Sequence, residues 1–214
     1  MEYETKNDIV YRLLKDEIIE GNLKPNERLV IADIAKKYNI SAMPVREAMK
    51  RLQQDGFVEN LTHVGTRVIS FNMEELKEII DVRTELENYA TRLATPLIDE
   101  PTIHILQDIL KEMEIIAKAK DSKRYSVLNK LFHMTIYKAA PNKVLYKQIS
   151  SLWEKSEISK SVFFLDPNRA DISVQEHKEW INAIQEHDTV KSVNLLKRHK
   201  EAAYRVLFDA YDNK

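Results

Sequence analysis

Glycine is almost absent from this chain, with three in 214 residues, and proline is nearly as rare, with six. A glycine-rich nucleotide-binding loop or a turn-rich β-sandwich needs more of these residues, so neither is expected. The chain has no cysteine, which excludes disulfides, thiolate-held zinc, iron–sulfur clusters and thiol catalysis. No apolar run is long enough to cross a membrane, and the acidic start is unlike a signal peptide. These features predict a mainly helical, soluble, cytoplasmic protein.

Residues 1–71 are predicted to form a separate DNA-binding domain of the winged helix-turn-helix type. Apolar periodicity and β-branched runs predict helices over 8–20, 31–38 and 41–54 and two hairpin strands over 57–61 and 67–70. In this fold the third helix lies in the major groove of DNA, while the hairpin, or wing, contacts the flanking backbone or minor groove.

The charge distribution supports a nucleic-acid partner. The net charge is −1, yet residues 36–54 carry five basic side chains against Glu47 alone. Such a cluster by itself is usually a solvated helix face, and the domain could instead mediate protein contacts; motif and charge together favour DNA. Arg46 is the best candidate for reading bases, and Ser41, at the helix start, for holding a phosphate. The predicted DNA contacts are Ser41, Met43, Arg46, Lys50 and Arg51 on the helix and His63, Gly65 and Thr66 on the wing.

Four segments in register resemble the N-terminal domain of GntR-family bacterial transcription regulators: GNLKPNERL (21–29), IA (34–35), ISAMPVREAM (40–49) and DGFV (55–58). The resemblance implies DNA binding. Two usual DNA-contacting arginines of the family are replaced by Ala32 and Ala42, so Arg46 is expected to carry more of the readout. Asn26 stands where the family has glycine, a tolerable change because asparagine accepts the left-handed backbone conformation.

Residues 72–214 are predicted to form an antiparallel six-helix bundle. Long apolar-striped segments alternate with short breaks at Pro101, Asp121, Pro141, Asp166-Pro167 and Asp188-Thr189. The expected helices cover residues 73–98, 101–119, 121–139, 142–165, 171–187 and 189–211.

Three histidines, His133, His177 and His199, lie in the apolar stripes of three different helices. A single histidine in such a position is usually a core residue satisfied by a neighbour. Three on separate helices of one bundle favour a metal site instead, because imidazole is the commonest transition-metal ligand and bundles build such sites from facing helices.

The helical half resembles the FCD ligand-binding domain of the FadR branch, and its six helices suggest the VanR-like group. The resemblance implies that Asn129, His133, His177 and His199 hold a divalent metal whose coordination a small carboxylate effector completes. Asn129 replaces a family aspartate, which lowers the expected affinity and leaves zinc and nickel as candidates. Arg83 matches a first-helix arginine that would clamp the effector carboxylate. The alternative for Arg83 is a surface ion pair with Glu87.

Together these observations predict a ligand-responsive, homodimeric regulator, expected to act as a repressor at a palindromic operator and not as an enzyme. A metal-dependent hydrolase with a three-histidine site is the alternative. It is disfavoured because no HExxH motif occurs and Glu176, directly before His177, is expected to point off the ligand face. A third reading is a metal-free dimer in which the histidines are only structural.

Overall fold

The computed structural model describes residues 5–55, 57–61, 64–69, 73–156, 161–166 and 168–212. The chain divides into two compact units, Met1–Asn72 and Met73–Lys214. The boundary falls one residue after the predicted one.

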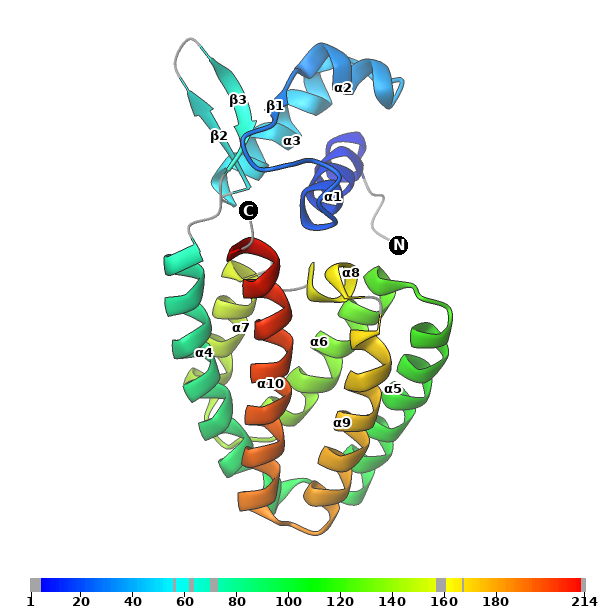
Figure 1. Ribbon diagram of the computed structural model, residues 1–214, viewed down its shortest axis with the longest axis vertical. Helices are drawn as coiled ribbons and strands as arrows, with labels where there is room; N and C mark the ends of the chain where they lie inside the picture. The colour runs from blue at the N-terminus through cyan, green and yellow to red at the C-terminus, as the bar shows by residue number, and fades with distance from the viewer. Residues whose placement is uncertain are drawn as a thin grey trace. The chain divides into compact units, whose positions relative to one another are not determined.

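Three helices and a three-stranded antiparallel sheet form the described part of the N-terminal unit (Figure 1). The apolar faces of the first and third helices pack together and bury Leu14 and Ile18 against a face that includes Val45 and Leu52. The strand order is β1-β3-β2, so the wing hairpin carries a short extra strand at one edge. This is a winged helix-turn-helix. Its elements are α1 (Lys6–Ile19), β1 (Arg28–Leu29), α2 (Ile31–Lys37), α3 (Ala42–Gln54), β2 (Val58–Leu61) and β3 (Gly65–Val68).

Two left-handed residues shape the turn after α1. Gly21, with φ +75°, follows the end of the helix as expected, and Asn26, with φ +66°, adopts the conformation that glycine has in the family motif.

Two strand predictions need correction. The second wing strand begins at Gly65 and not at residue 67, because Gly65 pairs with Leu61 and its φ of +94° lets the turn close there. Strand β1 was not predicted, since two residues are too few to show an alternating pattern.

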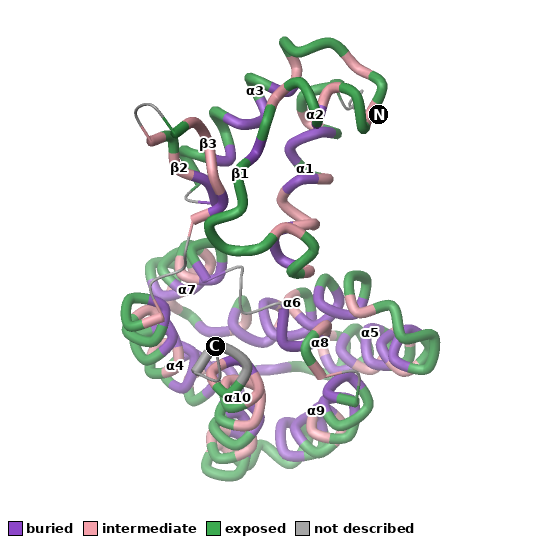
Figure 2. The backbone as a smooth tube through the Cα atoms, turned by 45° about the horizontal axis from the view of Figure 1, so that its top comes forward, coloured by how far each residue is buried: buried purple, intermediate pink, exposed green. Residues whose placement is uncertain are grey.

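In the described part of the C-terminal unit, six long helices form a bundle, and their buried sides face one another (Figure 2). Helix α10 packs between α4 and α9, α9 packs on α5, α5 on α6, and α6 on α4, while α7 lies against α4 and α6. The predicted mainly α architecture is confirmed. The elements are α4 (Met73–Ala94), the 3₁₀ turn η1 (Thr95–Leu97), α5 (Glu100–Lys118), α6 (Ser122–Lys138), α7 (Lys143–Lys155), the short α8 (Val162–Leu165), α9 (Arg169–Gln185) and α10 (Thr189–Asp212).

Side-chain caps begin several of these helices. Asp99, Asp121 and Asn142 each accept a hydrogen bond from the backbone N–H three residues later, at 2.9–3.0 Å. At the other end of α4, Pro96 has no N–H to donate, and the helix gives way to η1.

The prediction of one helix over 142–165 is wrong. Helix α7 ends at Lys155, and Ser156 leaves helical geometry while its hydroxyl donates to Leu152 O at 2.7 Å. The same hydroxyl accepts a hydrogen bond from Arg83 of α4, so the end of α7 is fixed by a tertiary contact. No helix within the described ranges is long and apolar enough to span a bilayer.

Candidate nucleic-acid interface and metal centre

Helix α3 separates an apolar side from a polar one. Val45, Ala48 and Leu52 are buried in the N-terminal unit, whereas Arg46 and Lys50 are exposed. Within the described residues neither of these two cations has a hydrogen bond or ion pair. The face that a recognition helix would present to a DNA groove is therefore basic, and Arg46 and Lys50 on it are available to contact DNA.

The start of α3 also suits a phosphate. Ser41 occupies the N-cap position with extended backbone, but its hydroxyl makes no cap hydrogen bond and stays exposed. Met43, in the next turn, is 67% exposed. The first backbone N–H groups of a helix lack intrahelical acceptors and favour an anion.

Arg51 is already engaged within the unit. Its guanidinium lies 4.1 Å from the ring centroid of Tyr11 and forms an ion pair with Asp8 at 3.1 Å. Arg51 therefore links α3 to α1 through these two contacts, which could not be predicted from its charge alone.

On the wing, Gly65 and Thr66 begin β3, and His63 lies outside the described residues. Arg28 of β1 was not predicted as a site residue. Its guanidinium passes within 3.7 Å of where a Cβ on Gly65 would sit, whereas the neighbouring Arg67 is paired with Glu59 at 2.7 Å. Arg28 is thus an exposed cation at the wing with no ion pair among the described residues.

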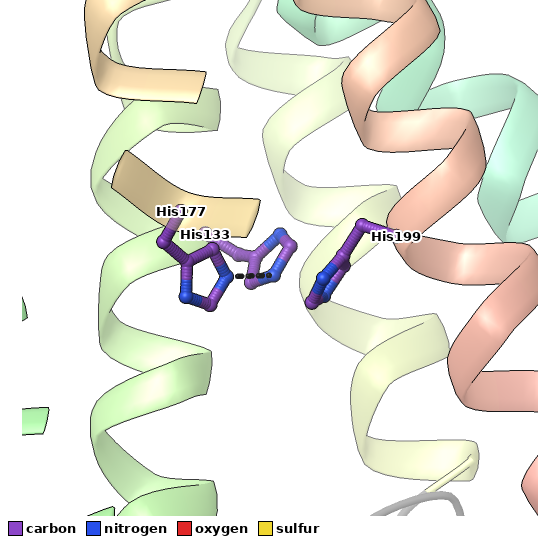
Figure 3. Close-up of side chains that lie close together, drawn as sticks. All are labelled: His133, His177 and His199. Atoms are coloured by element: carbon purple, nitrogen blue, oxygen red, sulfur yellow. Dashed lines mark hydrogen bonds between the residues drawn. The ribbon is translucent and has the colours of Figure 1, made fainter. Parts of the chain in front are cut away.

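In the bundle, the three predicted histidines come together from α6, α9 and α10 (Figure 3). His133, His177 and His199 are all buried, and one ring nitrogen of each lies within 4.8 Å of the others. The Nε2 atoms of His133 and His177 are 3.3 Å apart.

The electrostatic surroundings keep these imidazoles neutral. Burial, followed by the charges of neighbouring groups, holds the pKa of His133 and His177 well below the usual value. Burial also lowers the pKa of His199, although its hydrogen bond with Glu176 partly opposes the shift. A neutral imidazole has a free ring-nitrogen lone pair, which is the form a metal ion binds.

Glu176 does not point away from the cluster as predicted. Its Oε2 lies 2.7 Å from His199 Nδ1 and 2.6 Å from Arg169 Nη2. The helical position of a residue fixes its Cα direction, but a glutamate side chain is long enough to reach around to the neighbouring helix.

Asn129, one turn before His133, is buried and faces the same cavity as His133 and His199. Its Oδ1 has no hydrogen-bond partner among the described residues. A buried carbonyl oxygen without a partner is rare. The donor set, three neutral imidazoles and one unsatisfied amide oxygen, fits a borderline divalent cation such as zinc or nickel.

The cavity beside the histidines has a volume of about 40 Å³, room for an ion and a few waters. Its polar wall is formed from α4, α6 and α10, and its apolar wall includes side chains of α7 and α8. The lining residues are Arg83, Ser126, Asn129, His133, Trp153, Val162, Phe163, His199, Lys200, Ala203 and Tyr204.

Arg83 lines this cavity and is buried. It does pair with Glu87, with Nε 3.1 Å from Oε1, but the pair is inside the bundle and not on the surface. Its other nitrogens donate to Ser156 and Tyr204, and the guanidinium stacks 4.5 Å from the Trp153 ring.

Lys200 is a second buried cation at the cavity, missed by sequence reasoning although it directly follows His199. It forms an ion pair with Glu87. Burial and the charge of Arg83 lower the pKa of Lys200 to about 7, against the opposing effect of Glu87. Arg83 and Lys200 thus share one carboxylate, Glu87, and near neutral pH Lys200 is only partly protonated.

A winged helix-turn-helix unit followed by a helical bundle is an arrangement typical of DNA-binding transcriptional regulators. Comparison with known proteins agrees. Residues 6–68 match the gntR family of bacterial regulatory proteins, and residues 78–202 match the FCD domain. The chain belongs to the GntR family and carries an FCD domain.

Similar proteins span most of the chain. The HTH-type transcriptional regulator YdhC of Bacillus subtilis is 27% identical over 194 residues, which cover 90% of this chain and 82% of YdhC. The gluconate operon transcriptional repressor of the same organism is 26% identical over 175 residues, which cover 82% of this chain and 70% of the repressor. Among solved structures, Escherichia coli McbR/YncC aligns with a TM-score of 0.73 at 23% identity over 97% of this chain and 99% of that one. Lar of Listeria monocytogenes aligns with a TM-score of 0.65 at 17% identity over 98% of this chain and 99% of that one.

These families and relatives are transcription regulators and not enzymes, which decides against the metal-hydrolase alternative.

Proposed function

We propose that this regulator is a homodimeric repressor that binds a palindromic operator and responds to a small carboxylic acid together with a divalent metal. The observation that carries the sensing half is the cluster of His133, His177 and His199, of which His133 and His199 line a cavity together with the Asn129 amide and the Arg83 guanidinium. Several relatives are named as repressors, among them the gluconate operon repressor and GlaR of Escherichia coli. As a DNA-binding regulator, the protein would act in the cytoplasm.

For DNA, the proposed contacts are the start of α3 and the wing. Arg46 would read a base through its two-pronged guanidinium, while Ser41 and Lys50 would hold the backbone and Met43 would meet base edges. Gly65, Thr66 and Arg28 would contact DNA from the wing, and His63, which lies outside the described residues, stays a predicted contact. Arg51 is assigned a mainly structural role because Tyr11 and Asp8 already engage it.

For sensing, three imidazoles and Asn129 would hold the metal, which would act as a Lewis acid toward a carboxylate oxygen. The Arg83 guanidinium would bind the same carboxylate in a bidentate manner. To do so it has to exchange contacts that now join α4 to α7 and α10, namely those with Ser156 and Tyr204.

That exchange suggests how the signal leaves the cavity. Helix α4 begins at Met73, directly after the DNA-binding unit in the chain. A change in the packing of α4 would alter the separation of the two recognition helices in a dimer, whose half-sites must lie about 34 Å apart. The response is limited by the difference in effector affinity between the two arrangements.

The DNA half is tested by selecting duplexes from a random library at low salt with the full-length protein. An enriched palindrome is expected. Arg46→Ala should weaken its binding about tenfold or more, since one bidentate contact contributes about 1–3 kcal/mol. Arg92→Ala, which removes an exposed cation of α4, is the matched control and should bind as the wild type does. Failure to enrich any sequence would overturn the assignment.

The metal half is tested by elemental analysis of protein purified without added metal, before and after equilibration with zinc or nickel. We expect about one ion per chain in the wild type and loss of that ion in His177→Ala. His104→Ala, at an exposed position, should retain it. A wild-type protein that holds no ion after equilibration would instead support purely structural histidines.

A further inference from the structure

In two of the three histidines, His199 and His133, the Nδ1 atom has a hydrogen-bond partner outside the histidine cluster. At His199, the Nδ1 atom lies 2.7 Å from Glu176 Oε2. At His133, the Nδ1 atom lies 3.0 Å from the Tyr137 hydroxyl, which in turn lies 2.9 Å from Glu87 Oε2.

The Glu176 contact determines where His199 carries its proton. The same carboxylate oxygen, Glu176 Oε2, forms an ion pair with the buried guanidinium of Arg169, at 2.6 Å from Nη2. An ionised carboxylate only accepts hydrogen bonds, so His199 Nδ1 must donate. Its Nε2 then carries the lone pair. Arg169 Nη2 lies 3.3 Å from the same Nδ1 because both nitrogens donate to one oxygen, Glu176 Oε2.

The same reasoning applies to His133 through one intermediate group. Glu87 is fully buried and forms ion pairs with Arg83 and Lys200. The Tyr137 hydroxyl has one proton and donates it to Glu87, so it accepts from His133 Nδ1. The lone pair of His133 is again at Nε2.

His177 differs, because its Nδ1 has no hydrogen-bond partner among the described residues. Its Nε2 lies 3.3 Å from His133 Nε2, the contact drawn in Figure 3. Since His133 Nε2 carries a lone pair, His177 Nε2 donates the hydrogen bond between them. If a metal ion took up the lone pair of His133 Nε2, His177 Nε2 would lose the acceptor for its proton.

We infer that Glu176 and the Tyr137–Glu87 pair are positioning residues that fix His199 and His133 in the Nδ1–H tautomer before any ion arrives. Two of the three imidazoles are then already prepared as Nε2 ligands, and only His177 has to change its tautomer. Arg169 supports this arrangement: it is buried, and its Nη2 binds both the Glu176 carboxylate and the His199 carbonyl, at 2.6 and 3.1 Å. The inference rests on the proposed metal site for its purpose, but the tautomers are present without metal.

The tautomers can be read directly in the metal-free, full-length protein by long-range ¹H–¹⁵N correlation of the imidazole rings. In the wild type, His199 and His133 should each show a protonated Nδ1 and an unprotonated Nε2. In Glu176→Ala, His199 should become a mixture of both forms while His133 is unchanged. In Tyr137→Phe, His133 should become a mixture of both forms while His199 is unchanged. A wild-type His199 with its proton on Nε2 would overturn the inference whether or not the protein binds metal.

Affinity for zinc alone supplies the second measurement. Loss of an outer hydrogen-bond partner typically weakens metal binding 10–100-fold, and that range is expected for Glu176→Ala. Glu176→Gln, which keeps the size and one acceptor oxygen, should lose less. The matched control is Glu179→Gln, an exposed residue three positions along the same helix, which should leave the affinity unchanged.

The outcomes separate the two ideas. If the wild type binds zinc and all Glu176 variants bind it equally well while remaining folded by circular dichroism, the positioning role is wrong and the metal site stands. If the wild type binds no zinc but shows the expected tautomers, the metal site is wrong, and the hydrogen bonds still fix the two imidazoles as described.

Discussion

Glu87 has no solvent-exposed surface, and its carboxylate is held between a cation of its own helix, Arg83, and one from α10, Lys200. Burial of a carboxylate in a protein costs free energy unless such partners offset the loss of hydration. Because the Tyr137 hydroxyl also donates to it, Glu87 connects the cavity cations to the histidine cluster.

Removal of this carboxylate should destabilise the bundle strongly. In Glu87→Ala, two buried cations lose their counterion, and we expect a loss of about 3 kcal/mol in the free energy of unfolding, measured by urea denaturation. Lys200 relieves part of the penalty by releasing its proton, since its pKa is about 7. The exposed Glu85→Ala on the same helix should change stability by less than about 0.5 kcal/mol. Equal stabilities of the two variants would contradict a structural role for the buried pair.

Arg28 allows a comparable test in the DNA-binding unit. If it neutralises one phosphate, Arg28→Ala should weaken operator binding and reduce the slope of log affinity against log salt by about 0.9. Arg67, its cross-strand neighbour, is already paired with Glu59, so Arg67→Ala should change the slope less. Identical slopes for the two variants would remove Arg28 from the interface.

At the level of elements, the helix starts were the most predictable features. Asp121 occurs before an apolar stripe, and its side chain does cap α6. Asn142 caps α7 in the same way, with Oδ1 3.0 Å from Leu145 N.

Replacement of this cap should have a modest effect. Asn142→Ala leaves the Leu145 N–H without its side-chain acceptor, and we expect a loss of about 1 kcal/mol in the free energy of unfolding. Asn142→Asp, which retains an acceptor, should recover most of it. Thermal or urea unfolding measures both, and full stability of the alanine variant would show that the cap hydrogen bond contributes nothing.

Other boundaries could not be read from local sequence. The end of α7 at Lys155 has no glycine or proline to announce it, and Ser156, which follows it, is contacted by Arg83, more than seventy positions earlier in the chain. Strand β1 forms only because β3 is available to pair with it. Periodicity and capping residues locate long elements, but a break or a short strand that depends on a distant partner gives no local signal.

The same distinction applies to the site. The three histidines could be predicted to face one another because each lay in a helical apolar stripe. The partners of those histidines could not: the predicted direction of Glu176 was wrong, and Lys200 and Tyr137 were not singled out. Much of their role arises from contacts between helices that are remote in sequence, such as those of Glu176 with His199 and of Tyr137 with Glu87, 23 and 50 positions apart.

For the whole molecule, the buried titratable groups predict stability that rises with pH. Below about pH 6.5 the unfolded imidazoles bind protons, whereas the folded ones, with lowered pKa values, remain neutral. Each such histidine should lower the free energy of unfolding as the pH falls below about 6.5, by at most about 1.4 kcal/mol per pH unit. Lys200 acts in the same direction above pH 7, where only the unfolded chain keeps that proton.

At the alkaline end the trend should reverse. Burial raises the pKa of Tyr204 to about 12, so above pH 10 the unfolded chain releases a phenolic proton that the folded one retains. Urea unfolding from pH 5 to 11 in the presence of a chelator should therefore show a maximum between about pH 8 and 10. His177→Asn should flatten the acid limb, and His104→Asn, at an exposed position, should not. An acid limb unaffected by His177→Asn would exclude the imidazoles as its cause.

The proposed ion would be held by nitrogen and amide oxygen alone, in a chain that has no sulfhydryl group at all. Metal sensors built on thiolates lose their ion when an oxidant converts sulfur to sulfenic acid or a disulfide. Imidazole rings and amides undergo neither reaction. An ion held at the proposed site would therefore not be released through oxidation of a sulfur ligand when the cell meets peroxide.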